Sequence, residues 1–135
     1  MKKILFVCHG NICRSPMAEA IFRDMLDKQG LSDRFLVNSA AVSDEELGRP
    51  VYPAAQTELR RRGLPESAHR AWQLSREDYG RYDFFIGMDT DNIYRMQRIF
   101  GGDRDKKNRP AARLHGQPQG GGGPVVHRPV RLCVR

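Results

Sequence analysis

Apolar residues form short blocks along this chain, and polar and glycine-rich stretches separate them. Three of the blocks are largely apolar without alternation, which is typical of strands buried on both faces of a parallel sheet. They span residues 3–7, 35–40 and 83–88. We therefore predict three short parallel strands.

Between these blocks, apolar residues recur at the spacing of amphipathic helices. The first helix is predicted to open at Ser15, its N-cap, with Pro16 at the first helical position, and to stop at Gly30. Two further helices are predicted over residues 53–62 and 89–100. The predicted apolar face of the first helix is Ala18, Ile21, Phe22, Met25 and Leu26. The last helix is predicted to have the cap Asp89 and the apolar face Ile93, Met96, Ile99 and Phe100.

Strands that alternate with helices predict an α/β fold, a Rossmann-like three-layer sandwich around a small parallel sheet. Ligands of such folds bind at the carboxyl ends of the strands. Near residue 107 the pattern stops, and prolines and a glycine run at residues 120–123 follow, a composition typical of disorder. We predict an α/β domain over residues 1–107 and a disordered basic tail, rich in proline and glycine, over residues 108–135.

The net charge of +7 comes from the residues after Asp105, which include that tail. The first 105 residues carry 16 acidic and 16 basic side chains, whereas seven basic residues and no acidic one follow Asp105. No aromatic residue follows Phe100, so the tail offers nothing on which bases could stack. We interpret it as a solvated segment and expect no nucleic-acid partner.

The chain has no apolar stretch long enough for a membrane span, and the run after Met1 is too short for a signal peptide. Its three cysteines, Cys8, Cys13 and Cys133, form no disulfide framework. We expect a cytoplasmic protein without a membrane partner. Oligomeric state cannot be predicted from these features.

The most informative motif lies between the first strand and the first helix, where five residues separate Cys8 from Arg14. Backbone amides of the loop from His9 to Ser15 can point inward, and the helix N-terminus adds positive potential. A guanidinium can grip two phosphate oxygens, and Gly10 permits a tight backbone turn. The motif predicts a phosphate site with a thiolate nucleophile at Cys8.

The predicted reaction is an in-line displacement at phosphorus. Cys8 attacks, amides and Arg14 stabilise the equatorial oxygens, and Ser15 donates a hydrogen bond to the sulfur. A phosphocysteine results, and water hydrolyses it. No cofactor is expected, and no pair of cysteine and histidine has the spacing of zinc ligands.

Residues 7–16 (Val-Cys-His-Gly-Asn-Ile-Cys-Arg-Ser-Pro) closely resemble the signature loop of the low-molecular-weight protein tyrosine phosphatases of the bacterial type. The resemblance covers roughly three quarters of the chain and ends before an atypical tail. Its further motifs are Ser39-Ala40-Ala41, Gly48-Arg49-Pro50, His69-Arg70-Ala71 and the run from Met88 to Asn92.

The resemblance implies a role for each matching residue. Cys8 would be the nucleophile and Arg14 the clamp on the transition state, within a substrate-binding loop that comprises His9, Gly10, Asn11, Ile12, Cys13 and Ser15. Together with Asn11 and Ser15, Ser39 and His69 would fix that loop, and Cys13 would pair reversibly with Cys8 under oxidation. The aliphatic Ile12 resembles members that act on phosphotyrosine, so a phosphotyrosine protein is the expected substrate.

The tail departs from the family pattern. The family's general acid is an aspartate before a proline, after a fourth strand, and a last helix follows it; this chain has no Asp-Pro pair. We therefore identify no general acid, expect the fourth strand and last helix to be missing or degraded, and expect reduced activity on poor leaving groups.

Three alternatives remain open at this point. A phosphate-binding module without catalysis would retain the loop alone. An arsenate reductase on the same scaffold would need a further thiol, and only Cys133, in the tail, follows Cys13. Nucleic-acid binding by the basic tail is the weakest of the three.

Overall fold

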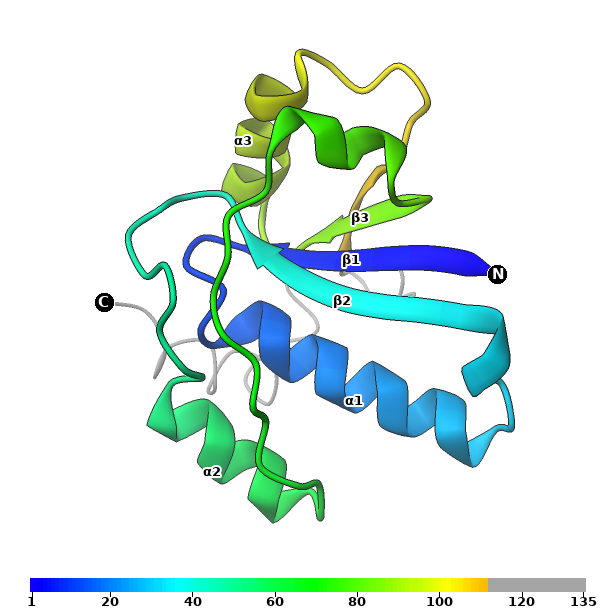
Figure 1. Cartoon of the computed structure of the whole chain (residues 1–135), viewed down its shortest axis with the longest axis vertical. Coiled ribbons are helices and arrows are strands. Elements are labelled where there is room, and N and C mark those ends of the chain that lie inside the picture. Colours follow the sequence, from blue (N-terminus) through cyan, green and yellow to red (C-terminus); the bar gives the residue numbers. More distant parts are fainter. Residues whose placement is uncertain (112–135) are drawn as a thin grey trace.

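The structure is a computed structural model in which residues 1–111 are described. Four strands alternate with three α-helices and two short 3₁₀-helices (Figure 1). In chain order these are β1 (Lys2–Cys8), α1 (Arg14–Lys28), η1 (Ser32–Arg34), β2 (Phe35–Ala41), α2 (Pro53–Arg61), η2 (Arg76–Gly80), β3 (Phe84–Gly87), α3 (Thr90–Phe100) and β4 (Asn108–Pro110).

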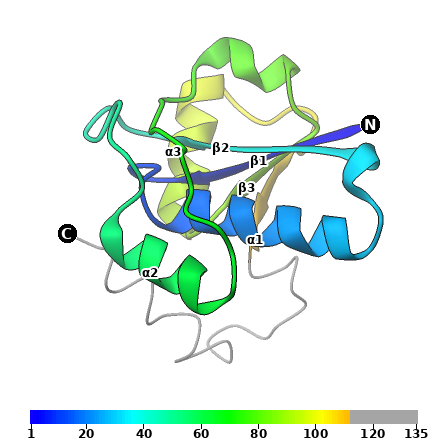
Figure 2. The same ribbon diagram turned by 60° about the horizontal axis from the view of Figure 1, so that its bottom comes forward.

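The strands form one parallel sheet in the order β2-β1-β3-β4. Helix α1 lies on one face of this sheet with α2 beside it, and α3 and η2 lie on the opposite face (Figures 1 and 2). The predicted three-layer α/β fold is confirmed. Because all strands run in the same direction, their carboxyl ends meet at one edge, which is where a ligand site is expected.

The residues of β1 alternate between two cores. Leu5 and Val7 pack on the side of α3, and Ile4 and Phe6 pack on the side of α1. Both faces of the strand are therefore buried, which explains why the sequence of β1 is continuously apolar. The first core also contains Ala40, Val42, Leu74, Phe85, Met96 and Phe100, and the second also contains Leu26, Val37 and Ile86.

Three details of the predicted first helix are wrong, and one is the position of Pro16, which is the third helical residue rather than the first. The N-cap is Cys13 rather than Ser15, because the Ser15 hydroxyl is turned toward the Cys8 sulfur and is not available as a cap. Met25, predicted to face the core, is 51% exposed. The predicted cap of α3 is confirmed, since the Asp89 side chain accepts a hydrogen bond from the Asn92 amide.

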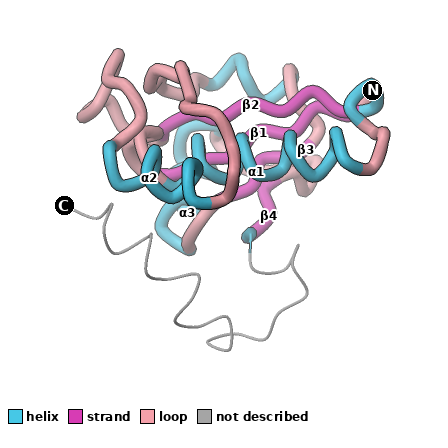
Figure 3. Tube along the Cα trace, turned by 90° about the horizontal axis from the view of Figure 1, so that it is seen from below, coloured by secondary structure: helices cyan, strands magenta, loops and turns pink. Residues whose placement is uncertain are grey.

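A fourth strand is present, although from the sequence we expected it to be missing or degraded. It is only three residues long, polar, and ends in Pro110, so no hydrophobic pattern marks it. The Asp103 carboxylate shapes the turn that precedes it by accepting hydrogen bonds from the amides of Lys107 and Asn108. The strand lies at the sheet edge (Figure 3), where proline is tolerated.

The sheet thus extends past residue 107, where the domain was expected to end. The predicted disordered tail and the family's last helix both concern residues that lie almost wholly outside the described part of the chain, so they stay predictions. Among residues 1–111, no helix is long and apolar enough to cross a membrane.

Candidate active site

The loop between β1 and α1 lies at the carboxyl edge of the sheet (Figure 1), and Cys8, the last residue of β1, directly precedes it. The Cys8 thiol is free and only 3% exposed. Two backbone amides point at its sulfur, Asn11 N at 3.3 Å and Ser15 N at 3.4 Å. The Ser15 hydroxyl lies 3.1 Å from the same atom. Such inward-facing amides favour negative charge, so the loop has the geometry of an anion site built around a thiol.

Asn11 organises this loop from within. Its φ of +61° is left-handed, a conformation that asparagine adopts more readily than most residues. Its Nδ2 donates to the hydroxyls of Ser15 (2.8 Å) and Ser39 (3.0 Å), and its Oδ1 accepts from Trp72 N at 3.2 Å. His69 Nε2 lies 2.7 Å from the same Oδ1. The buried carboxamide therefore ties the loop to β2 and to the segment between α2 and η2.

A buried carboxylate lies behind this network. Ser39 Oγ donates to Glu19 Oε1 at 2.6 Å, and the other oxygen of Glu19 pairs with Arg23 Nη2 at 2.9 Å. His69 Nδ1 lies 3.8 Å from Glu19 Oε1. Burial lowers the pKa of His69, the Glu19 carboxylate raises it in part, and Arg23 lowers it. The charge of the histidine that touches Asn11 thus depends on a carboxylate and a guanidinium on α1.

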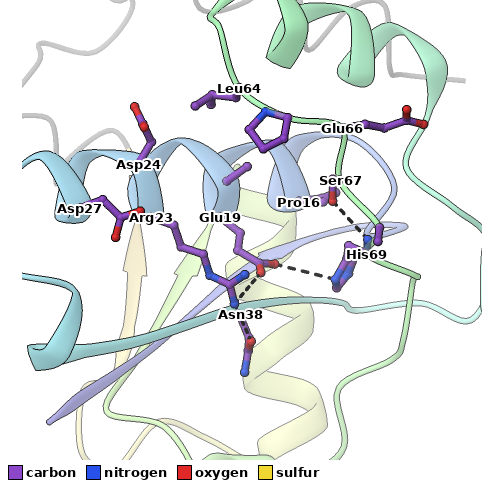
Figure 4. Close-up of a pocket in the computed structure, with 13 residues that line it drawn as sticks. Pro16, Glu19, Arg23, Asp24, Asp27, Asn38, Leu64, Glu66, Ser67 and His69 are labelled. Atoms are coloured by element: carbon purple, nitrogen blue, oxygen red, sulfur yellow. Dashed lines mark hydrogen bonds and ion pairs between the residues drawn. The ribbon is translucent and has the colours of Figure 1, made fainter.

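Glu19, Arg23 and His69 also line a hollow of about 540 Å³ between α1 and the segment that follows α2 (Figure 4). The other charged residues that line it are Asp24, Asp27 and Glu66. Neither Cys8 nor Arg14 belongs to its walls, so the hollow opens on the back of the hydrogen-bond network rather than on the sulfur. We therefore do not place the chemistry there.

Arg14 is the first residue of α1 and its side chain is 15% exposed. Its Nη1 donates to Asp89 Oδ2 at 2.6 Å. The other oxygen of Asp89 accepts from Asn92 N at 2.9 Å and caps α3. One carboxylate therefore holds the guanidinium of the loop against the helix that follows β3, and within residues 1–111 this contact uses only part of the guanidinium fork.

The loop from His9 to Ser15 is called the phosphate loop below. A second loop, residues 43–49, packs on its outer side. The amide and the hydroxyl of Ser43 both donate to the His9 carbonyl, at 3.2 and 2.9 Å. His9 Nε2 lies 3.1 Å from Glu45 Oε2. Glu46 packs so closely on Gly10 that a Cβ there would lie 2.9 Å from Glu46 Cγ. A side chain at position 10 would therefore require Glu46 to shift.

The side chains of Ile12 and Cys13 are buried, 7% and 4% exposed. The Ile12 carbonyl accepts a hydrogen bond from Tyr52 N at 2.6 Å, which fixes the loop to the start of α2. Cys13 packs with residues of α1 and α2. The substrate-binding roles predicted for these two residues stay predictions.

The structure brings every predicted site residue into or against one loop, including Ser39 from β2 and His69 from the far side of α2. Sequence reasoning missed Glu19 and the second role of Asp89. The spacing of Glu19, four residues after Ser15, was a usable signal because it places both on one helix face. For Asp89 no local signal existed, since its contact with Arg14 spans 75 residues.

No group of three or more histidine, cysteine, aspartate or glutamate side chains within residues 1–111 is arranged to hold a metal ion. The site described here therefore consists of one thiol, a set of hydroxyl and amide donors, and one guanidinium.

Comparison with known proteins yields one family. The family model described as low molecular weight phosphotyrosine protein phosphatase matches residues 3–110. The phosphatase of that name from Sus scrofa is 44% identical over 97 residues, which is 72% of this chain and 61% of the pig protein. The low molecular weight protein-tyrosine-phosphatase YfkJ of Bacillus subtilis is 43% identical over 101 residues, 75% of this chain and 65% of YfkJ.

Solved structures agree with these matches. The crystal structure of YfkJ superimposes with a TM-score of 0.83 at 36% identity and covers 87% of this chain and 74% of that one. The phosphatase SP-PTP from Streptococcus pyogenes gives a TM-score of 0.78 at 32% identity, with 98% and 85% covered. The chain thus spans less than two thirds of the length of the first curated relatives.

Proposed function

The chain belongs to the low molecular weight phosphotyrosine protein phosphatase family, and from this we propose that it hydrolyses phosphotyrosine in proteins through a phosphocysteine intermediate. We also propose that it acts in the cytoplasm, where thiols stay reduced. The observation that carries the proposal is the Cys8 sulfur, which faces two backbone amides and the Ser15 hydroxyl.

In the first step the Cys8 thiolate attacks phosphorus and the bond from phosphorus to the tyrosine oxygen breaks. The loop amides and the free part of the Arg14 fork hold the equatorial oxygens, whose charge is spread out in the loose transition state. Tyrosine leaves as a phenolate or, once protonated, as a phenol. In the second step water attacks phosphorus, the sulfur leaves as thiolate, and inorganic phosphate is released.

Ser15 supports both steps from a single position. Its hydroxyl receives a hydrogen bond from Asn11 Nδ2, which leaves its own proton for an acceptor. The Cys8 sulfur, at 3.1 Å, lies nearer than the other acceptor, the Ala40 carbonyl at 3.5 Å. A hydrogen bond to sulfur stabilises the thiolate before attack and again when sulfur leaves. The buried network of Asn11, Ser39 and His69 keeps that hydroxyl in place.

No proton donor for the leaving group is identified in the proposed reaction. The chain contains no Asp-Pro pair, and the one carboxylate shown beside Arg14, Asp89, is already engaged. We therefore propose that the departing oxygen is not assisted by a side-chain acid. That assistance is commonly worth about 10²–10⁴-fold, so activity should be reduced on phosphotyrosine and largely retained on esters with good leaving groups.

Hydrolysis of p-nitrophenyl phosphate tests this proposal, because nitrophenolate leaves readily. We expect phosphate release by the full chain, no release by Cys8→Ser, and a loss of about 10²–10³-fold for Arg14→Lys, which keeps the charge but not the fork. If the full chain binds phosphate but releases none from this ester, the protein is a phosphate-binding module and the proposal is wrong.

A further inference from the structure

We infer that Glu45 makes this protein prefer phosphotyrosine segments that carry lysine or arginine beside the phosphorylated residue. The inference rests on the proposed function, because it names the substrate class of the same phosphate site. It does not follow from the phosphate loop, which recognises only the phosphoryl group. It follows from the acidic loop that is packed against it.

The acidic loop, residues 43–49, is held in place beside the phosphate loop. Ser43 donates twice to the His9 carbonyl, and Val42 N donates to the Cys8 carbonyl at 3.1 Å. Glu46 lies against Gly10. These contacts fix the acidic loop and the residue before it to Cys8, His9 and Gly10, so its backbone lies beside the phosphate site.

Asp44 and Glu45 are both exposed in the acidic loop, and Glu45 is the one that reaches a residue of the phosphate loop. Its side chain is 64% exposed, and its contact is His9 Nε2 at 3.1 Å. Neighbouring carboxylates face arginines instead, Glu46 with Arg49 at 3.4 Å and Asp89 with Arg14 at 2.6 Å. Glu45 therefore places an exposed carboxylate at the mouth of the site, beside an imidazole that a substrate cation can displace.

A phosphopeptide carries two kinds of charged group that this site would contact. Its phosphoryl group binds the loop amides and Arg14, and its flanking side chains lie beside the acidic loop. A lysine or arginine beside the phosphotyrosine can take the place of His9 on Glu45, whereas an aspartate or glutamate is repelled. Screening limits the effect to about 8 Å at physiological salt, so only the nearest flanking positions are selected.

The experiment compares three phosphotyrosine peptides that differ only in their flanking residues, which are lysine, glutamine or glutamate. We expect kcat/KM of the full chain to fall from the first peptide to the last by about 3–10-fold in total, as suits exposed charge pairs. Raising the salt concentration should compress this range. Glu45→Gln should reduce the preference, and Glu45→Lys should reverse it.

The matched control is Asp33→Lys. Asp33 is exposed in η1, directly before β2 begins, and therefore lies at the end of the sheet opposite to the phosphate loop. This variant changes the net charge as much as Glu45→Lys does, and it should leave the preference unchanged. If both variants shift the preference equally, net charge rather than Glu45 sets it, and the inference is wrong.

Failure of the inference can be told apart from failure of the proposed function. Affinities of the three peptides for the Cys8→Ser protein report the preference without turnover. An enzyme that hydrolyses p-nitrophenyl phosphate but binds and cleaves the three peptides equally well contradicts the inference alone. A protein that ranks the peptides as expected but hydrolyses nothing supports the role of Glu45 and contradicts the proposed enzyme.

Discussion

Glu19 and Arg23 act on the phosphate loop through His69. Their charges reach His69, and His69 contacts the Asn11 oxygen that holds the loop. The Trp72 amide donates to that oxygen, so the Asn11 carboxamide has a fixed orientation and His69 Nε2 must be a protonated donor. The second ring nitrogen, Nδ1, faces the carboxylate and is the position at which His69 gains or loses its charge.

The pKa of His69 should respond in opposite directions to two neutralising substitutions. Glu19→Gln removes the charge that raises this pKa and should lower it, whereas Arg23→Gln removes a charge that lowers it and should raise it. Titration of the His69 ring protons by NMR in the wild type and both variants measures the two shifts. Shifts of the same sign, or none in either variant, would show that these residues do not set the charge of His69.

Single residues also show how far the site could be predicted. Cys8, Arg14 and Ser15 follow from local chemistry, because a loop between a strand and a helix concentrates amides around them. Ser39 and His69 required the family resemblance, since nothing local distinguishes them from ordinary turn residues. The spacing of Glu19 from Ser15 indicates a shared helix face, but its burial depends on contacts that are distant in sequence, such as that with Ser39.

At the scale of elements, α3 and the phosphate loop share one residue. Asp89 caps α3 with one oxygen and holds Arg14 with the other. Asparagine is as good a cap as aspartate, but it brings no negative charge to the guanidinium. The two roles can therefore be separated by substitution.

Asp89→Asn should leave the free energy of unfolding nearly unchanged and should reduce kcat/KM for p-nitrophenyl phosphate by roughly 10–100-fold, because a misplaced Arg14 no longer fits the transition state. Asp89→Ala should lose the same activity and also about 1 kcal/mol of stability through the missing cap. Denaturant unfolding measures the stability of both variants, and steady-state kinetics measure their kcat/KM. Full activity in Asp89→Asn would mean that Arg14 needs no such support.

The core face of α3 gives a second prediction for this scale. Met96 is fully buried in the cluster that joins α3 to β1 and β3. Met96→Ala should therefore cost about 2–5 kcal/mol of unfolding free energy. The exposed Tyr94 of the same helix supplies the control, because Tyr94→Ala should change stability little. Equal effects of the two substitutions would contradict the observed orientation of α3.

The elements that the sequence predicts well are those with buried apolar faces. Strands β1 and β3 and helices α1 to α3 carry that pattern, so their existence and order could be predicted. Strand β4 could not, because Asn108–Pro110 is polar and depends on the Asp103 turn and on pairing with β3. The predicted start of α1 was wrong for a related reason. The Ser15 hydroxyl contacts the Cys8 sulfur of β1 and does not cap the helix.

At the scale of the whole molecule, the proposed phosphate site is followed by a C-terminal stretch with no aspartate or glutamate after Asp105, and we identify no acid for the leaving group. Without that acid, the rate of the first step should depend strongly on how easily the phenolate departs. A series of aryl phosphates with increasingly basic leaving groups tests this. We expect kcat/KM to fall steeply along the series, and a flat dependence would mean that a side chain still donates the proton.

The same reasoning applies to the second step. The group that protonates the leaving oxygen normally also activates the attacking water, so its absence slows hydrolysis of the phosphocysteine. The intermediate should then accumulate, which makes it accessible to direct observation.

The most direct test of the account is therefore mass spectrometry of the protein quenched with acid during turnover of p-nitrophenyl phosphate. We predict a mass increase of one phosphoryl group, located on the peptide that contains Cys8 and absent from Cys8→Ser. Phosphate release without any phosphorylated Cys8, or an equal mass increase in Cys8→Ser, would contradict the claim that this sulfur is the nucleophile.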